Sequence, residues 1–268
     1  MVLSHILSKK NRALLRELVI TDFKLRYQGS VLGYAWSLLR PLLLFCILYV
    51  VFVKFMHIDF GIQHSAVYLL LGIVLWNFFG EMTSLSVGSI VGRGDLIRKI
   101  RIPRWIIVIS SSLTALINLA LNMLVVVVFM ILNHVDLMRS ALFLPLLLVE
   151  IYMFSLGLSL ILSAAFVRFR DISYIWEVVL QMLFYLTPII YPIARIPYVE
   201  LQKFVLLSPI AQVIQDARYA LVSHQTPTLY SLHATFWLAL IPYVLPVVLF
   251  VGGLLYFKHE SKYFAENI

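Results

Sequence analysis

The chain has 268 residues, of which 62% are hydrophobic and 13% are charged, and its mean hydropathy is +0.96. A soluble domain carries about 25% charged residues, so a chain this apolar could not cover its surface with polar groups in water, and an integral membrane protein is predicted. The formal net charge of +8 would indicate nucleic-acid binding only on a basic face of a soluble module. Here the basic residues lie between long apolar runs, which disfavours a nucleic-acid partner.

The first 33 residues predict an amphipathic helix. At about 100° per residue, Leu7, Leu14, Leu18 and Leu25 fall on one line, and Lys9, Arg12 and Arg16 fall opposite. This pattern is typical of a helix in the cytoplasmic membrane interface, with its cations toward anionic lipid headgroups. The pattern weakens after residue 19, where Asp22, Lys24 and Arg26 interrupt it. The helix is interpreted either as an anchor or as a gate at the cytoplasmic mouth.

Six apolar stretches are long enough to cross a bilayer, which takes about 20 residues. They are roughly residues 36–56, 66–84, 106–132, 141–166, 174–193 and 236–257. Pro188 and Pro192 interrupt the fifth, and are tolerable where neighbouring helices or water satisfy the freed carbonyls. With six spans, most lysines and arginines gather on the side that holds both termini, which predicts that side to be cytoplasmic. The predicted fold class is an all-α integral membrane protein with six transmembrane helices.

The loop between the second and third stretches combines charge with helix signals. Asp95 can cap a short helix, and Pro103 discourages its continuation. Leu96, Ile97 and Ile100 give this helix an apolar face beside a basic one. Such a loop is either an ordinary positive connection or a docking element for a cytosolic partner.

Polar residues recur inside the predicted spans. Thr114, Asn118 and Asn122 form one stripe, Glu177, Gln181 and Tyr185 a second, and Ser155, Ser159 and Ser163 a small-residue face suited to close helix packing. Intramembrane polar groups must face protein or a water-filled cavity. The stripes are therefore interpreted as helix–helix contacts or as cavity walls.

The segment 194–235 is too long for a tight connection, and its apolar stretch is too short to cross the bilayer. It predicts one or two re-entrant helices between spans 5 and 6, which are allowed where protein or a water-filled cavity receives them. Several tyrosines cluster near this end, either as an interfacial belt or as a lining for sugars, whose rings can contact aromatic faces.

The sequence contains no Gly-x-x-x-x-Gly-Lys-Ser/Thr loop, no His-Glu-x-x-His and no Cys-x-x-Cys, and its seven histidines are scattered. We therefore predict no catalytic residues, no metal site and no ATPase activity in this chain. Energy for transport would have to come from another subunit, and two copies of the chain would be needed to wall a pore.

Four blocks of the sequence resemble ABC-2 type permeases that export polysaccharides, chiefly O-antigen and wall teichoic acid exporters. The first block, residues 17–42, reads ELVITDFKLRYQGSVLGYAWSLLRPL. The others are the loop that ends in Ile102-Pro103, the stretch 169–172 (FRDI) and the stretch 187–192 (TPIIYP). The first block departs from the family at Arg40-Pro41, where Asn-Pro is expected.

The resemblance implies a homodimer in the bacterial inner membrane, paired with two copies of a cytosolic ATPase that binds ATP and magnesium, while this chain holds no cofactor. It implies a gate segment (1–33) and a six-span domain (34–268) with a coupling loop (93–104) and a re-entrant segment (194–235). The residues expected to contact the ATPase are Asp95, Leu96, Arg98, Lys99, Arg101 and Arg104.

The cargo implied by the resemblance is a polysaccharide on an undecaprenyl pyrophosphate lipid, most of all an O-antigen. The residues expected at the lipid pyrophosphate are Lys24, Arg26 and Arg40; those expected to line the glycan channel are Tyr34, Trp36, Tyr49, Phe52, Tyr185 and Tyr191. A glycan slides best past aromatic faces that bind weakly and often.

Other readings stay open on the sequence alone. The same fold class exports teichoic acid, capsule polymers, small lipids and drugs. An ion-coupled carrier would use Glu150 and Glu177. A polyprenyl-linked sugar transferase would need a carboxylate or histidine pair at one membrane face, and the sequence arranges none.

Overall fold

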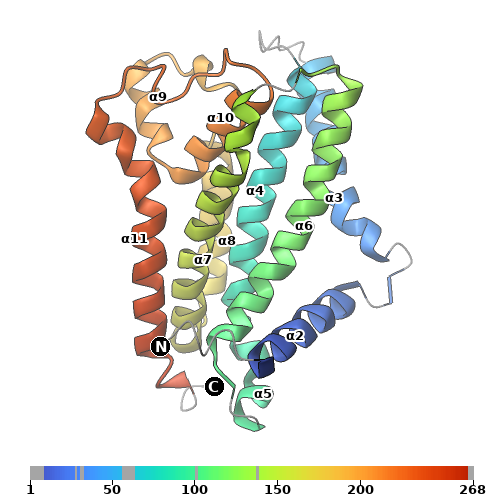
Figure 1. Ribbon diagram of the computed structural model, residues 1–268, viewed down its shortest axis with the longest axis vertical. Helices are drawn as coiled ribbons and strands as arrows, with labels where there is room; N and C mark the ends of the chain where they lie inside the picture. The colour runs from blue at the N-terminus through green and yellow to red at the C-terminus, as the bar shows by residue number, and fades with distance from the viewer. Residues whose placement is uncertain are drawn as a thin grey trace.

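The computed structural model describes residues 9–27, 29–30, 33–55, 64–99, 102–136 and 139–264, and these ranges contain helices and no strand. The helices that run along the long axis of the molecule are α3 (Trp36–Tyr49), α4 (Ser65–Val87), α6 (Trp105–Leu132), α7 (Leu144–Arg168), α8 (Ile172–Leu186) and α11 (Phe236–Glu260) (Figure 1). The 3₁₀ helix η1 (Gly33–Ala35) leads into α3, the π-helix η2 (Val50–Phe55) continues it, and the 3₁₀ helix η4 (Arg139–Phe143) precedes α7.

Four of the six predicted spans are long, apolar helices. The segments long and apolar enough to cross a membrane are Ser65–Val87, Trp105–Leu132, Arg139–Arg168 and Phe236–Glu260. Helices α3 and α8, at the first and fifth predicted spans, have 14 and 15 residues. Helix α8 ends at Leu186 because Pro188 disfavours a helical conformation in the residue before it. Four crossings are therefore supported by helix length, and a total of six remains a prediction.

Helix α4 forms the centre of the bundle. It packs against α3, α6, α7, α8 and α10, and 16 of its 23 residues are buried. Its sequence is apolar on all sides, as expected of a helix enclosed by others. Helix α8 is the opposite case: none of its described residues is buried, and its contacts are with α4 and α7.

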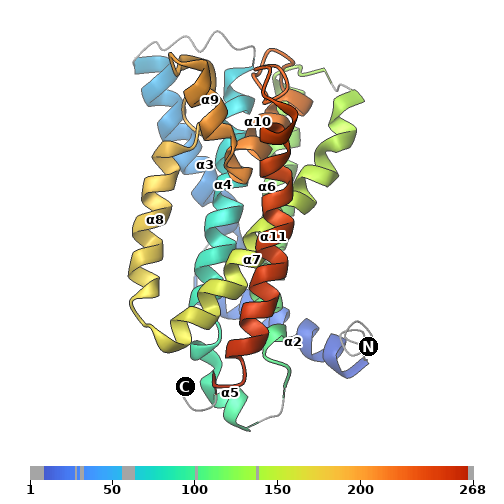
Figure 2. The ribbon, with the colours of Figure 1, turned by 90° about the vertical axis from the view of Figure 1, so that its left-hand side faces the viewer.

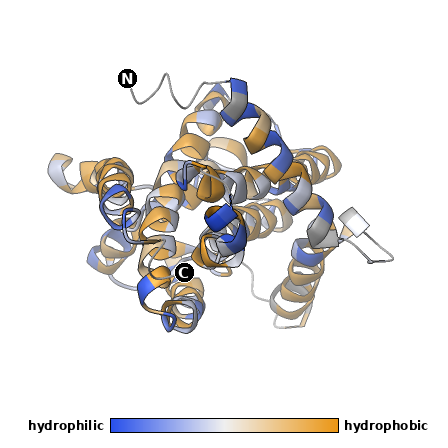
Figure 3. Cartoon of the chain, turned by 90° about the horizontal axis from the view of Figure 1, so that it is seen from below, coloured by the Kyte–Doolittle hydropathy of each residue, from blue (hydrophilic) through white to orange (hydrophobic). Residues whose placement is uncertain are grey.

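The two ends of the bundle carry different short elements (Figures 1 and 2). One end carries α2 (Lys9–Tyr27), the 3₁₀ helix η3 (Val91–Arg93) and α5 (Gly94–Lys99). The other carries η5 (Ile193–Arg195), α9 (Val199–Leu206) and α10 (Pro209–Leu221). Seen from the α5 end, hydrophilic residues gather at the helix ends and along α2, and the long helices are mostly hydrophobic (Figure 3). The amphipathic N-terminal helix is confirmed as a helix, and it packs on α6.

The predicted re-entrant segment contains two short helices, α9 and α10. Eleven of the 13 residues of α10 are buried, and it packs against α4, α7 and α11. A helix of 13 residues spans about 20 Å, which is too short to cross the hydrocarbon core. Helices α9 and α10 are thus too short to span the membrane, as predicted for this segment. That they enter the membrane remains a prediction.

Arg218 holds this end of the bundle together. Its side chain is fully buried, and it donates hydrogen bonds to the carbonyl oxygens of Tyr68 (3.1 Å), Pro188 (2.6 Å) and Ile189 (2.7 Å). Its guanidinium carbon also lies 3.6 Å from the centroid of the Tyr68 ring. Arg218 belongs to the segment 194–235, and its guanidinium satisfies one carbonyl of α4 and two carbonyls of the turn that follows α8. The backbone carbonyls of Pro188 and Ile189 thus find their hydrogen-bond donor inside the protein, in an arginine.

Two glycines bring α7 and α11 into close contact. A Cβ added to Gly157 would lie 2.6 Å from the carbonyl oxygen of Leu249, and one added to Gly253 would collide with the backbone of Gly157. Close approach through small residues is a common basis of helix association in lipid. The helix pair α7 and α11 forms the most extensive contact between described elements.

We predict that Gly253→Ala destabilises the protein by about 1–3 kcal/mol, because the added methyl group overpacks the contact with α7. The matched control is Gly252→Ala, where an added Cβ meets no atom within 4 Å. A lower midpoint of thermal unfolding in detergent for Gly253→Ala alone would support this packing, and equal midpoints for the two variants would contradict it.

Candidate functional site

Helix α5 lies at one end of the bundle (Figure 2) and contains three charged residues. Asp95 lies in its first turn, and Arg98 and Lys99 lie in its last turn, the placement that the helix dipole favours. These three side chains are exposed, whereas Leu96 is half-buried. The predicted short amphipathic helix is present, and it offers an exposed charged surface to a partner.

Two further residues predicted to contact a partner are placed differently. Arg104 is half-buried at the start of α6, with its guanidinium 5.8 Å from the centroid of the Phe264 ring. Arg101 lies outside the described residues. The structure therefore groups Asp95, Arg98 and Lys99 on α5 and ties Arg104 to the C-terminal end of the described chain.

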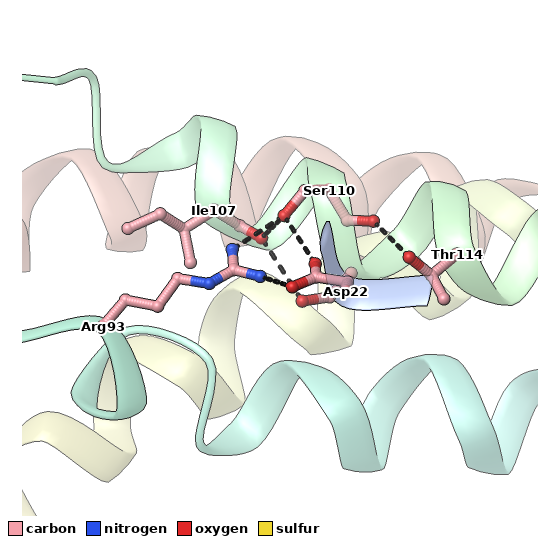
Figure 4. Close-up of polar contacts among 6 residues, drawn as sticks. Asp22, Arg93, Ile107, Ser110 and Thr114 are labelled. Atoms are coloured by element: carbon pink, nitrogen blue, oxygen red, sulfur yellow. Dashed lines mark hydrogen bonds and ion pairs between the residues drawn. The ribbon is translucent and has the colours of Figure 1, made fainter. Parts of the chain in front are cut away.

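An ion pair connects α2 to the loop that carries α5 (Figure 4). Arg93 of η3 pairs with Asp22 of α2, and its Nη1 also donates to the hydroxyl of Ser110 on α6 at 2.9 Å. The Ser110 hydroxyl in turn donates to the carbonyl of Ile107 at 2.8 Å. Only about a fifth of each charged side chain is exposed. This contact, the latch, joins three elements: α2, the α5 loop and the start of α6.

The sequence analysis did not assign the latch. Asp22 was noted only as a residue that interrupts the amphipathic pattern of the first helix. A carboxylate on the wrong side of an amphipathic helix at the membrane surface needs a partner, and Arg93 supplies it from 71 positions away. The break in the amphipathic pattern at Asp22 was therefore the feature of the sequence that could have indicated a buried ion pair.

A polar cavity of about 720 Å³ lies between α3, α4 and α6. Its lining residues are Ser30, Trp36, Ser37, Arg40, Pro41, Leu43, Trp76, Asn77, Gly80, Glu81, Ser84, Leu85, Asn118, Asn122 and Leu180. This volume is within the range of small-molecule sites, which are mostly apolar with a few polar groups. The lining here adds amides, hydroxyls, a carboxylate and a guanidinium to an apolar surface that includes two tryptophans. The cavity is the main candidate binding site in the described part of the chain.

Hydrogen bonds give the cavity wall a defined arrangement. Asn118 donates to the Glu81 carboxylate at 2.5 Å, and Asn122 donates to the backbone carbonyls of Asn118 at 2.8 Å and Ser37 at 3.3 Å. The side-chain oxygen of Asn118 is buried and accepts no hydrogen bond. The lining therefore includes the Glu81 carboxylate, an acceptor that suits a ligand with hydroxyl donors.

The predicted pyrophosphate and channel residues fall in several places. The lining includes Arg40 and Trp36 but not Lys24, which is exposed on α2. Tyr49 is half-buried near the end of α3, with its ring 5.7 Å from that of Phe45. The side chains of Arg26, Tyr34 and Phe52 lie outside the described part of the structure.

The two predicted tyrosines at the other end of the bundle lie together. Tyr185 is exposed at the end of α8, and the Tyr191 hydroxyl donates to the carbonyls of Tyr185 (3.2 Å) and Leu186 (3.1 Å). Tyr191 thus satisfies carbonyls that Pro188 and Pro192 leave without helical donors. Glu177 and Gln181, from the same predicted stripe as Tyr185, are also exposed on α8.

Four cavity residues were missed by the sequence analysis: Trp76, Asn77, Glu81 and Ser84, all on α4. The stripe that contains Asn118 and Asn122 was found because it repeats at helical spacing. Glu81 stands in an apolar run with no such repeat, and its role depends on how α4 crosses α6. Its charge inside a predicted span was the one signal that could have found it.

Comparison with known proteins places the chain among bacterial transport proteins. The model of a family described as ABC-2 type transporter matches residues 13–222. An O-antigen export system permease protein, RfbA of Klebsiella pneumoniae, is 30% identical over 201 residues, which cover 74% of this chain and 75% of the relative. RfbA of Myxococcus xanthus is 29% identical over 96% of both chains. The polysialic acid transport protein KpsM of Escherichia coli is 25% identical over 91% of this chain and 92% of its own.

We predict that the cavity between α3, α4 and α6 admits water. In a Cys46→Ser background, a charged thiol reagent should modify Ser84→Cys, whose side chain is exposed in the cavity wall, much faster than Ser159→Cys, which is fully buried between α4 and α7. Labelling rates followed by mass spectrometry test this. Equal rates for the two cysteines would mean that the cavity is closed or filled.

Proposed function

The chain belongs to the ABC-2 type transporter family, and from this premise we propose that it is the membrane subunit of a bacterial polysaccharide exporter. Its similarity to O-antigen export permeases over 96% of the chain favours this cargo class. ABC-2 permeases are not themselves enzymes, so the energy comes from ATP and magnesium on a separate ATPase. The subunit resides in the cytoplasmic membrane, with the α5 end and both termini facing the cytosol.

The polar cavity is the observation that carries the proposal. A polysaccharide offers many hydroxyl donors and flat, weakly polar ring faces. The cavity offers groups that match these: a carboxylate on Glu81, a side-chain amide on Asn77, and aromatic rings on Trp36 and Trp76. A small apolar drug would take water away from the charged and amide groups of the lining without offering them hydrogen bonds, which costs free energy. The lining therefore favours a glycan over the alternative of a small lipid or drug.

Arg40 is the proposed contact for the anionic part of the carrier lipid. It lines the cavity at the start of α3, and a guanidinium recognises phosphate oxygens through charge-assisted hydrogen bonds. We propose that the undecaprenyl pyrophosphate end enters near Arg40 and that the glycan follows past the tryptophans. O-antigen is the favoured cargo, with teichoic acid and capsule polymers as alternatives.

A second copy of the chain completes the channel. Helix α8 has no buried residue, and its exposed large apolar side chains are Tyr174, Ile175, Val178, Met182, Tyr185 and Leu186. The stripe of Glu177, Gln181 and Tyr185 lies on the same helix. A homodimer would give the polar stripe a protein or water-filled environment, as intramembrane polar groups require.

Helix α5 is the proposed docking element for two copies of the ATPase. Its exposed Arg98 and Lys99 can steer an acidic partner surface, and Asp95 can orient a basic group of that surface. Docking must favour one of two conformations of the membrane subunit in order to drive transport. The latch offers a route for this effect, since Arg93 directly precedes α5 and holds α2 through Asp22.

We expect Arg98→Glu with Lys99→Glu to weaken the binding of the ATPase by at least about tenfold, equal to about 1.4 kcal/mol, because both charges face the partner. The control, Lys258→Glu with Lys262→Glu, makes the same charge change at the end of α11. Co-purification with the ATPase, at matched membrane insertion, is the measurement. Unchanged co-purification of the α5 variant would remove this helix from the interface.

A charge exchange tests the latch. Asp22→Asn or Arg93→Gln should uncouple ATP hydrolysis from polymer export, because α2 loses its connection to the α5 loop. The double variant Asp22→Arg with Arg93→Asp should recover part of the export by restoring the ion pair, with a coupling energy on the order of 1–3 kcal/mol. If the double variant is as defective as the sum of the single variants, the pair does not carry the coupling.

A further inference from the structure

Helix α2 packs on α6 near the end of the bundle that carries α5 (Figure 1), and a groove of about 590 Å³ lies between the two helices. It shares no lining residue with the polar cavity between α3, α4 and α6. Its lining residues are Arg12, Leu15, Arg16, Val19, Ile20, Leu113, Leu116, Ile117 and Ala120. This surface, the α2–α6 groove, offers two cations beside apolar side chains, and its described lining includes no hydroxyl, amide or carboxylate side chain.

The α6 wall of the groove lies at the depth of lipid acyl chains. Helix α6 has 28 residues, which correspond to about 42 Å and so to the thickness of a bilayer with its headgroups. Leu113 and Ala120 lie about 12 and 22 Å along the helix from its first residue, below the headgroup region. Ile117 and Ala120 are exposed. In a membrane, this wall therefore contacts the acyl chain of a lipid.

The α2 wall adds positive charge to this apolar surface. Arg12 and Arg16 lie one turn apart, and both line the groove with exposed side chains. Among the described residues, no carboxylate forms an ion pair with either of them. A cation beside the hydrocarbon region is costly unless an anion accompanies it, although a long side chain can raise its charge to the headgroup level. The groove thus calls for a negative group joined to an apolar chain.

We propose that the α2–α6 groove is a discrete binding site for one anionic phospholipid of the membrane. Its phosphate contacts Arg12 and Arg16, because guanidinium groups donate charge-assisted hydrogen bonds to phosphate oxygens, and its acyl chain lies against Ile117 and Ala120. The bound lipid fastens the first half of α2 to α6, whereas the latch fastens the second half through Asp22. The site does not depend on the cargo of the transporter.

Photo-crosslinking of the full chain tests the proposal, in phosphatidylcholine vesicles that contain a phosphatidylglycerol with a photoreactive acyl chain. Mass spectrometry should locate adducts on residues 113–120. Excess unlabelled phosphatidylglycerol should remove them, whereas excess phosphatidylcholine or inorganic phosphate should not. Arg12→Gln with Arg16→Gln should lower the adduct yield about tenfold. The matched control, Lys9→Gln with Lys24→Gln, removes two exposed charges from the same helix outside the groove and should keep most of the yield.

A second variant tests the apolar wall without changing any charge. Ala120→Trp adds a large side chain at an exposed position, so it should fill the groove and remove the adducts on residues 113–117 while the chain still inserts and keeps its midpoint of thermal unfolding. A normal yield of adducts in this variant would show that the acyl chain does not occupy the groove.

Three other outcomes would overturn the proposal. Equal losses in the two charge variants would indicate diffuse attraction between α2 and the membrane surface. Equal competition by phosphatidylcholine would indicate acyl contact without recognition of charge, and competition by inorganic phosphate would indicate a site for a free anion. Polymer export is measured separately from these adducts, so a failed lipid assignment leaves the proposed transport function untouched.

Discussion

In a bilayer, a buried polar group must find its partner inside the protein, and the bundle is organised around this requirement. The end of α8 is the clearest case. Pro188 and Pro192 stop the helix and leave carbonyls that no helical N–H can reach. Arg218 and Tyr191 donate to these carbonyls from outside the helix. The guanidinium thus joins α10 to α4 and to the turn after α8, and the closed end of the bundle depends on it.

The same requirement separates two kinds of polar site in the molecule. Around Arg218 each of the three guanidinium nitrogens donates at least one hydrogen bond, and the side chain is fully buried. In the cavity between α3, α4 and α6, the lining carries a carboxylate, a guanidinium and side-chain amides around an open space of about 720 Å³. The arrangement around Arg218 is suited to stabilising the fold. The second is suited to a passage for a hydroxylated polymer, which must bind weakly at many points.

The sequence predicted most of the architecture because apolar runs and helical spacing are local properties. Helices α4, α6 and α11 begin and end within a few residues of the predicted spans. The helix at 9–27, the short helix near Asp95 and the polar stripe of Asn118 were also found. Contacts between distant segments were not predictable: Glu81 meets Asn118, and Asp22 meets Arg93, only because of the angles at which helices cross. The contacts of Arg218 were not predicted either, since no local pattern marks a buried arginine.

The distance in sequence between Arg218 and its partners has a consequence for biosynthesis. Tyr68 lies 150 residues before Arg218, so α4 is inserted into the membrane long before its arginine partner leaves the ribosome. Until then, the narrow space beside Gly72 that receives the guanidinium must remain unfilled. The end of the bundle that carries α10 is therefore completed late, after α10 has been synthesised. A chain truncated before Arg218 would leave this space open to the quality-control machinery of the membrane.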